Sequence, residues 1–309
     1  VGKLKSLYRV GLGFRYGRSM QSIAGMHFNY SVSRNLLKKL HEEMAPEETL
    51  TDFTNAMYFK MIRNFRRHSW LLLYLFGSSP VVDANFLKGK KHNLTKLGKD
   101  TYGKEFATSL RMGGLGYTSS AQDDISICYN QLETYVKTLE SARKRSYAPY
   151  EEIRVKVDGE YRQLNANLLQ IDNEFYSPLR PKRTARSGES ALQALHQHGV
   201  EYIEVRLLDL NPFAAQGIND EEIKFLQAFL TFCMLDESPE ISSAECDEIT
   251  SNFQTVVDDG RNPKARLSFN GGKVSVSNAA LELLQKIENF GGSSSEIHGY
   301  YGEGILAHS

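Results

Sequence analysis

The stretch that begins at Val200 and ends at Phe213 reads VEYIEVRLLDLNPF. Its apolar and polar residues alternate, which predicts a strand with one buried face and one polar face. Successive side chains of a strand point to opposite faces. The apolar face therefore carries Ile203, Val205 and Leu207. Glu204 and Arg206 share the polar face, which is left to a ligand or to solvent.

The polar pair of this strand combines two groups with complementary chemistry. The carboxylate of Glu204 is a hard ligand suited to Mg²⁺, and the planar fork of Arg206 matches phosphate oxygens. The pair therefore indicates part of a site for a metal ion and a phosphate. The alternative is an ordinary ion pair on a solvated strand face, and this stretch alone does not decide between the two.

A second stretch, GMHFNYSV over residues 25–32, alternates in the same way and places His27, Asn29 and Ser31 on one polar face. If both strands belong to one curved sheet, their polar faces line a shared cleft. Imidazole and carboxylate could then hold a divalent ion that also contacts a nucleotide phosphate. A histidine in a strand is more often an ordinary hydrogen-bonded residue, and spacing alone does not demonstrate contact.

The composition is that of an ordinary globular protein. The chain has 309 residues, of which 41% are hydrophobic and 24% are charged, and this length can bury a sizeable core. Its 37 basic and 37 acidic residues cancel, so net charge gives no indication of a nucleic-acid partner. The longest apolar run, from Trp70 to Phe76, is too short to span a membrane. We therefore expect neither a nucleic-acid nor a membrane partner.

The three cysteines, Cys128, Cys233 and Cys246, are far apart and lack the spacing of metal ligands. Few, scattered cysteines are typical of proteins in a reducing compartment, so we expect a cytoplasmic location. No signal peptide is visible. Each cysteine is interpreted as a small apolar residue.

Periodicity and turn residues predict the remaining elements. Helices are expected over residues 4–25, with an interruption at 11–13, and over 33–43, 51–76, 120–144 and 219–235. A hairpin is expected to turn at Asp158-Gly159, with loops over 84–105 and 180–189 and a mobile Gly/Ser-rich tail over 291–309. Because strands and helices do not alternate regularly, the sequence predicts an α+β fold with a largely antiparallel sheet.

Two loops are further candidate binding sites. Four cations fall within seven residues, and they repel one another unless an anion is near: Arg180, Lys182, Arg183 and Arg186. This loop is either a phosphate site or a solvated surface loop. The stretch TSLRMGGLGY over residues 108–117 lacks both the P-loop and the dinucleotide fingerprint. It is either a binding loop for a small polar substrate or a structural turn.

Several long motifs in this order and spacing resemble the proteobacterial type of glutamate–cysteine ligase: LYRVGLGFRYGRSMQSIAG, GMHFNYS, SLRMGGLGYT, RPKRTARSGES and VEYIEVRLLDLNPF. The resemblance covers residues from about 4 to 240. It implies a glutamine synthetase-like fold, in which a curved, largely antiparallel sheet with surrounding helices forms a cleft. It also implies ATP-dependent ligation of the glutamate γ-carboxylate to cysteine through γ-glutamyl phosphate, the first step of glutathione biosynthesis.

The resemblance also implies roles for particular residues. His27 and Glu204 match metal-ligand positions for Mg²⁺ or Mn²⁺, and Arg206 matches the arginine that contacts the transferred phosphoryl group. Positions around the cysteine-substrate pocket are matched by Tyr8, Arg9, Leu12, Gln21, Arg111, Tyr117 and Tyr176. For Arg180, Lys182 and Arg183 the resemblance suggests contact with the nucleotide phosphates.

One departure from the family pattern concerns the extent of the chain. The family carries an acidic Gly-x-Glu-x-Glu motif upstream of the part present in this sequence, and it continues beyond the last residue. Residues 1–309 are therefore expected to form part of a catalytic ligase domain, without full activity by themselves. Two alternatives stay open: a γ-glutamyl ligase with another amine acceptor, and an inactive homologue that binds an amino acid or a nucleotide.

Overall fold

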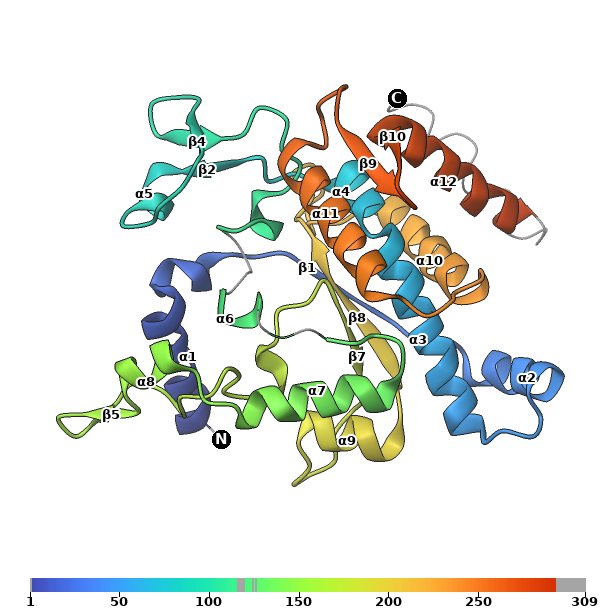
Figure 1. Cartoon of the computed structure of the whole chain (residues 1–309), viewed down its shortest axis with the longest axis horizontal. Helices are drawn as coiled ribbons and strands as arrows, with labels where there is room; N and C mark the ends of the chain where they lie inside the picture. Colours follow the sequence, from blue (N-terminus) through green and yellow to red (C-terminus); the bar gives the residue numbers. More distant parts are fainter. Residues whose placement is uncertain (1, 116–119, 124, 126, 293–309) are drawn as a thin grey trace.

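The computed structural model describes residues 2–115, 120–123, 125 and 127–292 (Figure 1). Tyr117 and the predicted mobile tail beyond residue 292 lie outside this part of the chain. Helices and short strands are mixed, and every pairing between the named strands is antiparallel. The structure thus has the α+β character that the sequence predicts.

The central sheet has three strands in the order β1-β8-β7. They are β1 (Met26–Tyr30), β8 (Tyr202–Leu208) and β7 (Leu179–Lys182). The two strands predicted from alternating residues, β1 and β8, are direct neighbours. Asn29 on one side and Arg180 on the other stand opposite Glu204, so polar residues form a row across one face of the sheet.

The pairing of β1 with β8 slips by one residue near its end. Met26 pairs with Leu208, whereas Phe28 pairs with Val205. Two residues of β8, Arg206 and Leu207, therefore stand opposite His27 alone. Such a bulge bends the strand and re-aims side chains, and bulges are over-represented beside active sites.

The apolar face of β8 is the centre of the hydrophobic core. Ile203, Val205 and Leu207 are fully buried, and burying each of these side chains stabilises the fold by about 1.5–3 kcal/mol. The covering helices are α3 (Leu50–His68), α4 (Trp70–Phe76) and α10 (Asp220–Leu235). α4 contacts β8, α3 contacts β7, and α10 packs along α3. In Figure 1, α3 and α10 lie to the right of the sheet, whereas α1 and α8 lie to its left.

The first helix, α1 (Gly2–Tyr16), continues through the glycines where an interruption is expected. Gly11 is buried there, and a Cβ atom at this position would lie 2.8 Å from Nε2 of Gln170. The absence of a side chain therefore allows close packing against Gln170. The helix continues through this position because a single glycine costs a helix only about 1 kcal/mol. The predicted helix over 51–76 is instead two helices, which meet at Ser69.

Local capping and turn signals predict several elements correctly. Asn219 precedes α10 and forms a reciprocal capping box with Glu222. Asp158 and Gly159 have φ values of 49° and 85°, as a two-residue type I′ hairpin requires. The hairpin joins β5 (Lys156–Val157) to β6 (Glu160–Tyr161), and the helix expected over 33–43 is α2 (Arg34–Met44).

Three further regions differ from the prediction. The expected loop over 84–105 contributes to a small sheet with the strand order β2-β4-β3. Its strands are very short and lie within a lysine-rich segment that resembles loop sequence. Its elements are β2 (Val81–Asp83), α5 (Ala84–Leu87), β3 (Thr95–Lys96) and β4 (Thr101–Gly103). The helix expected over 120–144 is divided into α6 (Ser120–Asp123) and α7 (Leu132–Lys144). The basic segment from Arg180 begins as strand β7 rather than as a loop.

The remaining elements lie around this framework. Two short helices are α8 (Ala148–Ile153) and α9 (Ala191–His198), and 3-10 turns form η1 (Arg18–Ser22), η2 (Leu110–Met112) and η3 (Asp172–Glu174). The C-terminal part, which the sequence did not predict, has α11 (Ser243–Asp259), β9 (Arg266–Phe269), β10 (Gly272–Ser275) and α12 (Val276–Gly292).

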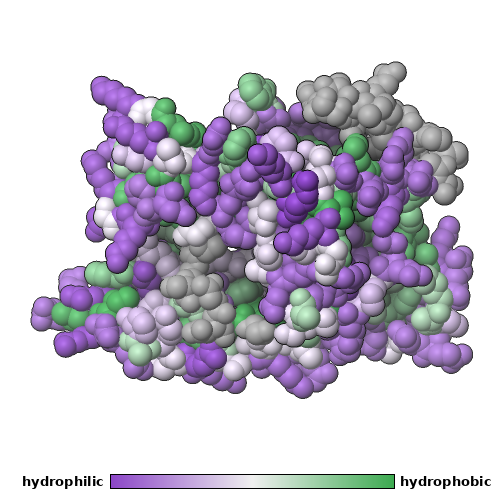
Figure 2. All heavy atoms as spheres, turned by 45° about the horizontal axis from the view of Figure 1, so that its top comes forward, coloured by the Kyte–Doolittle hydropathy of each residue, from purple (hydrophilic) through white to green (hydrophobic). Residues whose placement is uncertain are grey.

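Hydrophilic side chains cover most of the face shown in Figure 2, and hydrophobic ones form small separate groups. Among the described residues, no helix combines the length and the apolar character needed to cross a membrane. Cys233 lies in the core, as the interpretation of an apolar residue requires, while Cys128 and Cys246 are partly buried.

Candidate active site

A cavity of about 270 Å³ brings together residues that are far apart in the sequence. Four of the predicted site residues line it: His27, Arg111, Tyr176 and Arg206. They come from β1, from η2, from the segment that precedes β7, and from β8. The cavity therefore lies on the side of the central sheet that carries its polar row.

The carboxylate of Glu204 connects the charged groups at this cavity. Its Oε1 lies 3.4 Å from Nδ1 of His27. Its Oε2 lies 3.1 Å from an Arg206 guanidinium nitrogen and 3.4 Å from Nζ of Lys182. These three contacts come from three neighbouring strands, so the sheet itself fixes their positions.

The surroundings set the protonation of this group. Burial alone would raise the pKa of Glu204, but the positive charges of Lys182 and Arg206 outweigh burial and lower it. Burial and the charge of Arg206 lower the pKa of His27. The carboxylate is therefore ionised and the imidazole neutral near pH 7, which are the forms that bind a metal ion.

His27 and Glu204 fit a divalent ion only as part of its coordination sphere. The part of the chain described by the structure holds no group of three or more His, Cys, Asp or Glu side chains that could bind a metal. Mg²⁺ is often bound through one or two carboxylates, with water and substrate phosphates as its other ligands. One carboxylate beside a neutral imidazole is compatible with such a shared ion.

Arg111 forms a fixed wall of the cavity. Its Nε donates to Oδ1 of Asp209 at 2.7 Å, and one of its terminal nitrogens donates to the carbonyl oxygen of Leu207 at 2.5 Å. Asp209 in turn accepts hydrogen bonds from the hydroxyl groups of Ser79 and Ser109, at 2.7 and 3.0 Å. The stretch that begins at residue 108 is thus anchored to the end of β8 through Arg111.

The basic residues of β7 and of the segment after it are engaged by other groups of the protein. Arg180 is buried and donates to the carbonyl oxygen of Phe175, and burial together with Arg206 lowers its pKa. Arg183 lies 4.0 Å from a carboxylate oxygen of Glu201. Of the three residues predicted to contact phosphates, Lys182 forms an ion pair with Glu204 at 3.4 Å, and Arg180 stands opposite Glu204 in the sheet.

The structure divides the residues predicted for the cysteine pocket. Burial and the charge of Glu174 raise the pKa of Tyr8, and Tyr176 adds to the effect, so Tyr8 lies on the side of Tyr176. Arg9 and Gln21 instead line a separate hollow of about 670 Å³ beside α1, where the Gln21 side chain donates to the Arg9 carbonyl oxygen at 3.1 Å. Leu12 is partly buried on the same helix.

Helix α11 supplies residues that the sequence reasoning missed. Thr250, Phe253 and Gln254 complete the wall of the cavity. A signal for this helix was present, because Ser242 is followed three residues later by Glu245. The Ser242 hydroxyl group indeed accepts from the Glu245 amide at 3.2 Å.

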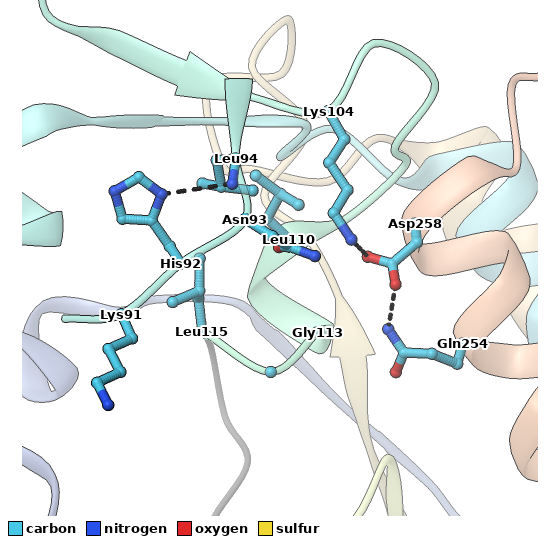
Figure 3. A pocket seen from close by; sticks show the side chains of 11 residues that line it. Lys91, His92, Asn93, Leu94, Lys104, Leu110, Gly113, Leu115, Gln254 and Asp258 are labelled. Atoms are coloured by element: carbon cyan, nitrogen blue, oxygen red, sulfur yellow. Dashed lines mark hydrogen bonds and ion pairs between the residues drawn. The ribbon is translucent and has the colours of Figure 1, made fainter. Parts of the chain in front are cut away.

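A larger hollow, of about 570 Å³, lies next to η2, where Leu110 and Gly113 line it (Figure 3). Its charged groups are paired or point apart: Nζ of Lys104 lies 2.6 Å from Asp258, which also accepts from Gln254 at 2.8 Å. His92 turns toward the amide of Leu94. Size alone therefore does not indicate the functional site, because the charges that converge line the smaller cavity.

The family model of glutamate–cysteine ligase matches residues 1–256. The chain belongs to the glutamate–cysteine ligase family. It is 48% identical over 299 residues to the glutamate–cysteine ligase of Pseudomonas putida, covering 97% of this chain and 57% of the relative. It is 52% identical over 261 residues to that of Hahella chejuensis, covering 84% of this chain and 50% of the relative. The chain thus spans about half the length of the curated relatives that it matches.

Solved structures agree with this membership of the glutamate–cysteine ligase family. The glutamate–cysteine ligase of Francisella tularensis, solved in complex with AMP, has a TM-score of 0.88 and 35% identity, covering 97% of this chain and 59% of that one. A bifunctional glutathione synthetase of Pasteurella multocida has a TM-score of 0.62 and 25% identity, covering 94% and 32%. These similarities confirm the fold class expected from the resemblance.

Proposed function

We propose that the protein carrying this chain joins the γ-carboxylate of glutamate to the amine of cysteine, with ATP as co-substrate, in glutathione biosynthesis. One observation carries the proposal: His27, Arg111, Tyr176 and Arg206 converge on one cavity beside Glu204, in a chain of this family. The relative from Francisella tularensis was solved with AMP, which supports an adenine nucleotide as ligand.

The reaction needs activation because a carboxylate is a poor electrophile at neutral pH. ATP transfers its γ-phosphoryl group to a γ-carboxylate oxygen of glutamate and leaves as ADP. The cysteine amine then attacks the carbonyl carbon, phosphate leaves with the C–O bond electrons, and the nitrogen loses a proton. Phosphoryl transfer of this kind depends mainly on positioning and on stabilisation of charge.

The chain contributes charge stabilisation and orientation to both steps. The Arg206 guanidinium stabilises negative charge on the transferred group, and Glu204 holds that guanidinium through the 3.1 Å contact. A bound Mg²⁺ or Mn²⁺ ion would neutralise phosphate charge, with Glu204 and His27 among its ligands. Arg111 and Tyr176 border the space for the amino acid and help to exclude water from the acyl phosphate.

The same reasoning extends to the remaining predicted roles. Tyr8 joins Tyr176 on the amino-acid side of the site, and Lys182 is the cation that is best placed for nucleotide phosphate. None of these predicted residues lines the cavity itself: Tyr8, Lys182, Arg9, Leu12, Gln21, Arg180 and Arg183. Tyr8 and Lys182 are supported by their interactions with Tyr176 and Glu204, and the other five have less support. Residues 1–309 then supply one part of a catalytic ligase domain, and a cytoplasmic location stays a prediction.

The test is a phosphate-release assay on the complete protein that carries this chain, with ATP, glutamate and Mg²⁺. We expect release that depends on cysteine and is much slower with simple amines, with 2-aminobutyrate between the two. Equal rates with all of these acceptors would favour a γ-glutamyl ligase with another natural acceptor. Nucleotide binding without turnover of any acceptor would contradict the enzyme proposal and favour a binding protein.

A further inference from the structure

We infer that Asp209 and Gly25 are positioning residues, which hold the guanidinium of Arg111 in its place at the cavity wall. The inference deepens the proposed function, on which it rests for the role of the cavity. Asp209 lies one residue beyond β8 and is 98 positions away from Arg111 in the sequence. The proposed acceptor pocket would thus depend on a residue outside the set that the sequence indicates.

Asp209 holds Arg111 through a buried, fully engaged carboxylate. The two side chains have exposed fractions of 3% and 8%, so solvent screens their attraction little. Oδ1 accepts from Nε of Arg111 at 2.7 Å and from the Ser109 hydroxyl group at 3.0 Å. Oδ2 accepts from the Ser79 hydroxyl group at 2.7 Å and from the Ser78 amide at 2.9 Å. Four donors from one segment and a neighbouring turn therefore fix the orientation of this carboxylate.

Gly25 leaves the space that the guanidinium of Arg111 occupies. A Cβ atom at Gly25 would lie 2.6 Å from both Cζ and a terminal nitrogen of Arg111. The end of a flexible side chain would normally move away from such a contact. Here the hydrogen bonds to Asp209 and to the carbonyl oxygen of Leu207 resist the movement. A methyl group at this position is therefore expected to displace the guanidinium or to weaken those bonds.

The two observations predict one shared consequence. Asp209→Asn removes the charge that holds Arg111 while keeping the shape of the side chain, and Gly25→Ala pushes Arg111 without changing any charge. A merely structural role would lower stability and affect every substrate alike. A positioning role changes the acceptor amino acid selectively, because Arg111 borders that part of the cavity.

The experiment uses the complete protein and two measurements. We expect Asp209→Asn and Gly25→Ala to raise the KM for cysteine by about tenfold or more, the effect of losing one charge-assisted hydrogen bond, with the KM for ATP nearly unchanged. The second measurement is the rate at which phenylglyoxal modifies Arg111, followed by peptide mass spectrometry. Both variants should increase that rate by about fivefold, because one net hydrogen bond is lost.

Glu245→Gln is the matched control, because Glu245 pairs with Arg67 at 2.5 and 3.1 Å and lines none of the cavities described above. It should accelerate modification of Arg67, with the reactivity of Arg111 and the KM for cysteine unchanged. Unchanged reactivity of Arg111 in both test variants would overturn the inference. An equal rise in both KM values would also overturn it. Absence of cysteine-dependent turnover in the unmodified protein would refute the proposed function instead, while the modification rates still decide whether Arg111 is held.

Discussion

The two faces of β8 differ in burial and in charge. On one face, Ile203, Val205 and Leu207 are fully buried against helices. On the other face, Glu204 and Arg206 stand among further cations in partly buried positions. Burial opposes the charged form of Glu204, and these cations favour it. The comparison shows that alternate residues of one strand have different roles, one set in the core and the other at the candidate site. The apolar face stabilises the sheet, whereas the polar face concentrates charged groups that a ligand can use.

The largest expected effect is a loss of stability on the apolar face. Leu207→Ala should lower the free energy of unfolding by about 2–5 kcal/mol, because it removes buried methyl groups and leaves a cavity. Urea denaturation of the complete protein measures this loss. Leu281→Ala on α12, where the side chain is 49% exposed, is the control and should change stability by less than about 0.5 kcal/mol. A loss below about 1 kcal/mol for Leu207→Ala would contradict the contrast between the faces.

On the polar face the largest effect should fall on turnover. Arg206→Ala should reduce the ligase rate by about 10²–10³-fold, as removal of a preorganised charge stabiliser does elsewhere, while the melting temperature stays within a few degrees or rises. Arg206→Lys should recover only part of the rate, because lysine lacks the planar fork. Lys137→Ala removes an exposed cation of α7 and serves as the control. Near-normal turnover in Arg206→Ala would remove this residue from the mechanism.

A smaller effect concerns the metal ion. Glu204→Gln should raise the Mg²⁺ concentration for half-maximal turnover by about 10–100-fold, because the amide loses the negative charge that attracts the ion. It also leaves Lys182 and Arg206 without their shared partner. The measurement is a Mg²⁺ titration of the initial rate at saturating ATP. An unchanged titration curve would exclude Glu204 as a ligand.

The smallest expected effect is a dependence of stability on pH, and it compares two histidines. Burial lowers the pKa of His68 from 6.5 to about 4, and the pKa of the half-exposed His27 is also lowered. The unfolded chain therefore takes up these protons first, so the stabilisation is complete above pH 6.5 and is lost as the pH falls toward 4. His68→Gln should flatten the melting temperature over this range, and His27→Gln should flatten it less. If the dependence of the melting temperature on pH is unchanged in His68→Gln, His68 is not the group responsible for it.

Local signals were sufficient to predict much of the framework. The alternation in β1 and β8, the capping box at Asn219 and the turn at Asp158-Gly159 each lie within a few residues of sequence. They could be recognised because the physical cause is equally local. The family resemblance added Arg111 and Tyr176, which line the cavity with His27 and Arg206.

The rest depends on contacts between distant segments. The hold of Asp209 on Arg111 links residues 98 positions apart, and no periodicity encodes it. The strands from Val81 to Gly103 are too short to show a pattern, and their pairing comes from the tertiary structure. Likewise, a sequence motif on α1 and η1 cannot show which residues face the site, which is why Arg9 and Gln21 were grouped with Tyr8.

The bulge in β8 changes which face of the sheet the residues after it point to. Glu204, Arg206 and Asp209 are separated by two and then by three positions, and a regular strand cannot present all three on one side. The extra residue opposite His27 allows Leu207 and Leu208 to enter the core in succession, so that Asp209 emerges on the side of Arg111. One inserted residue therefore lets a single strand supply the carboxylate beside Arg206 and the anchor of Arg111. Without the bulge, a regular strand of the same sequence would place Asp209 on the face opposite to Glu204 and Arg206.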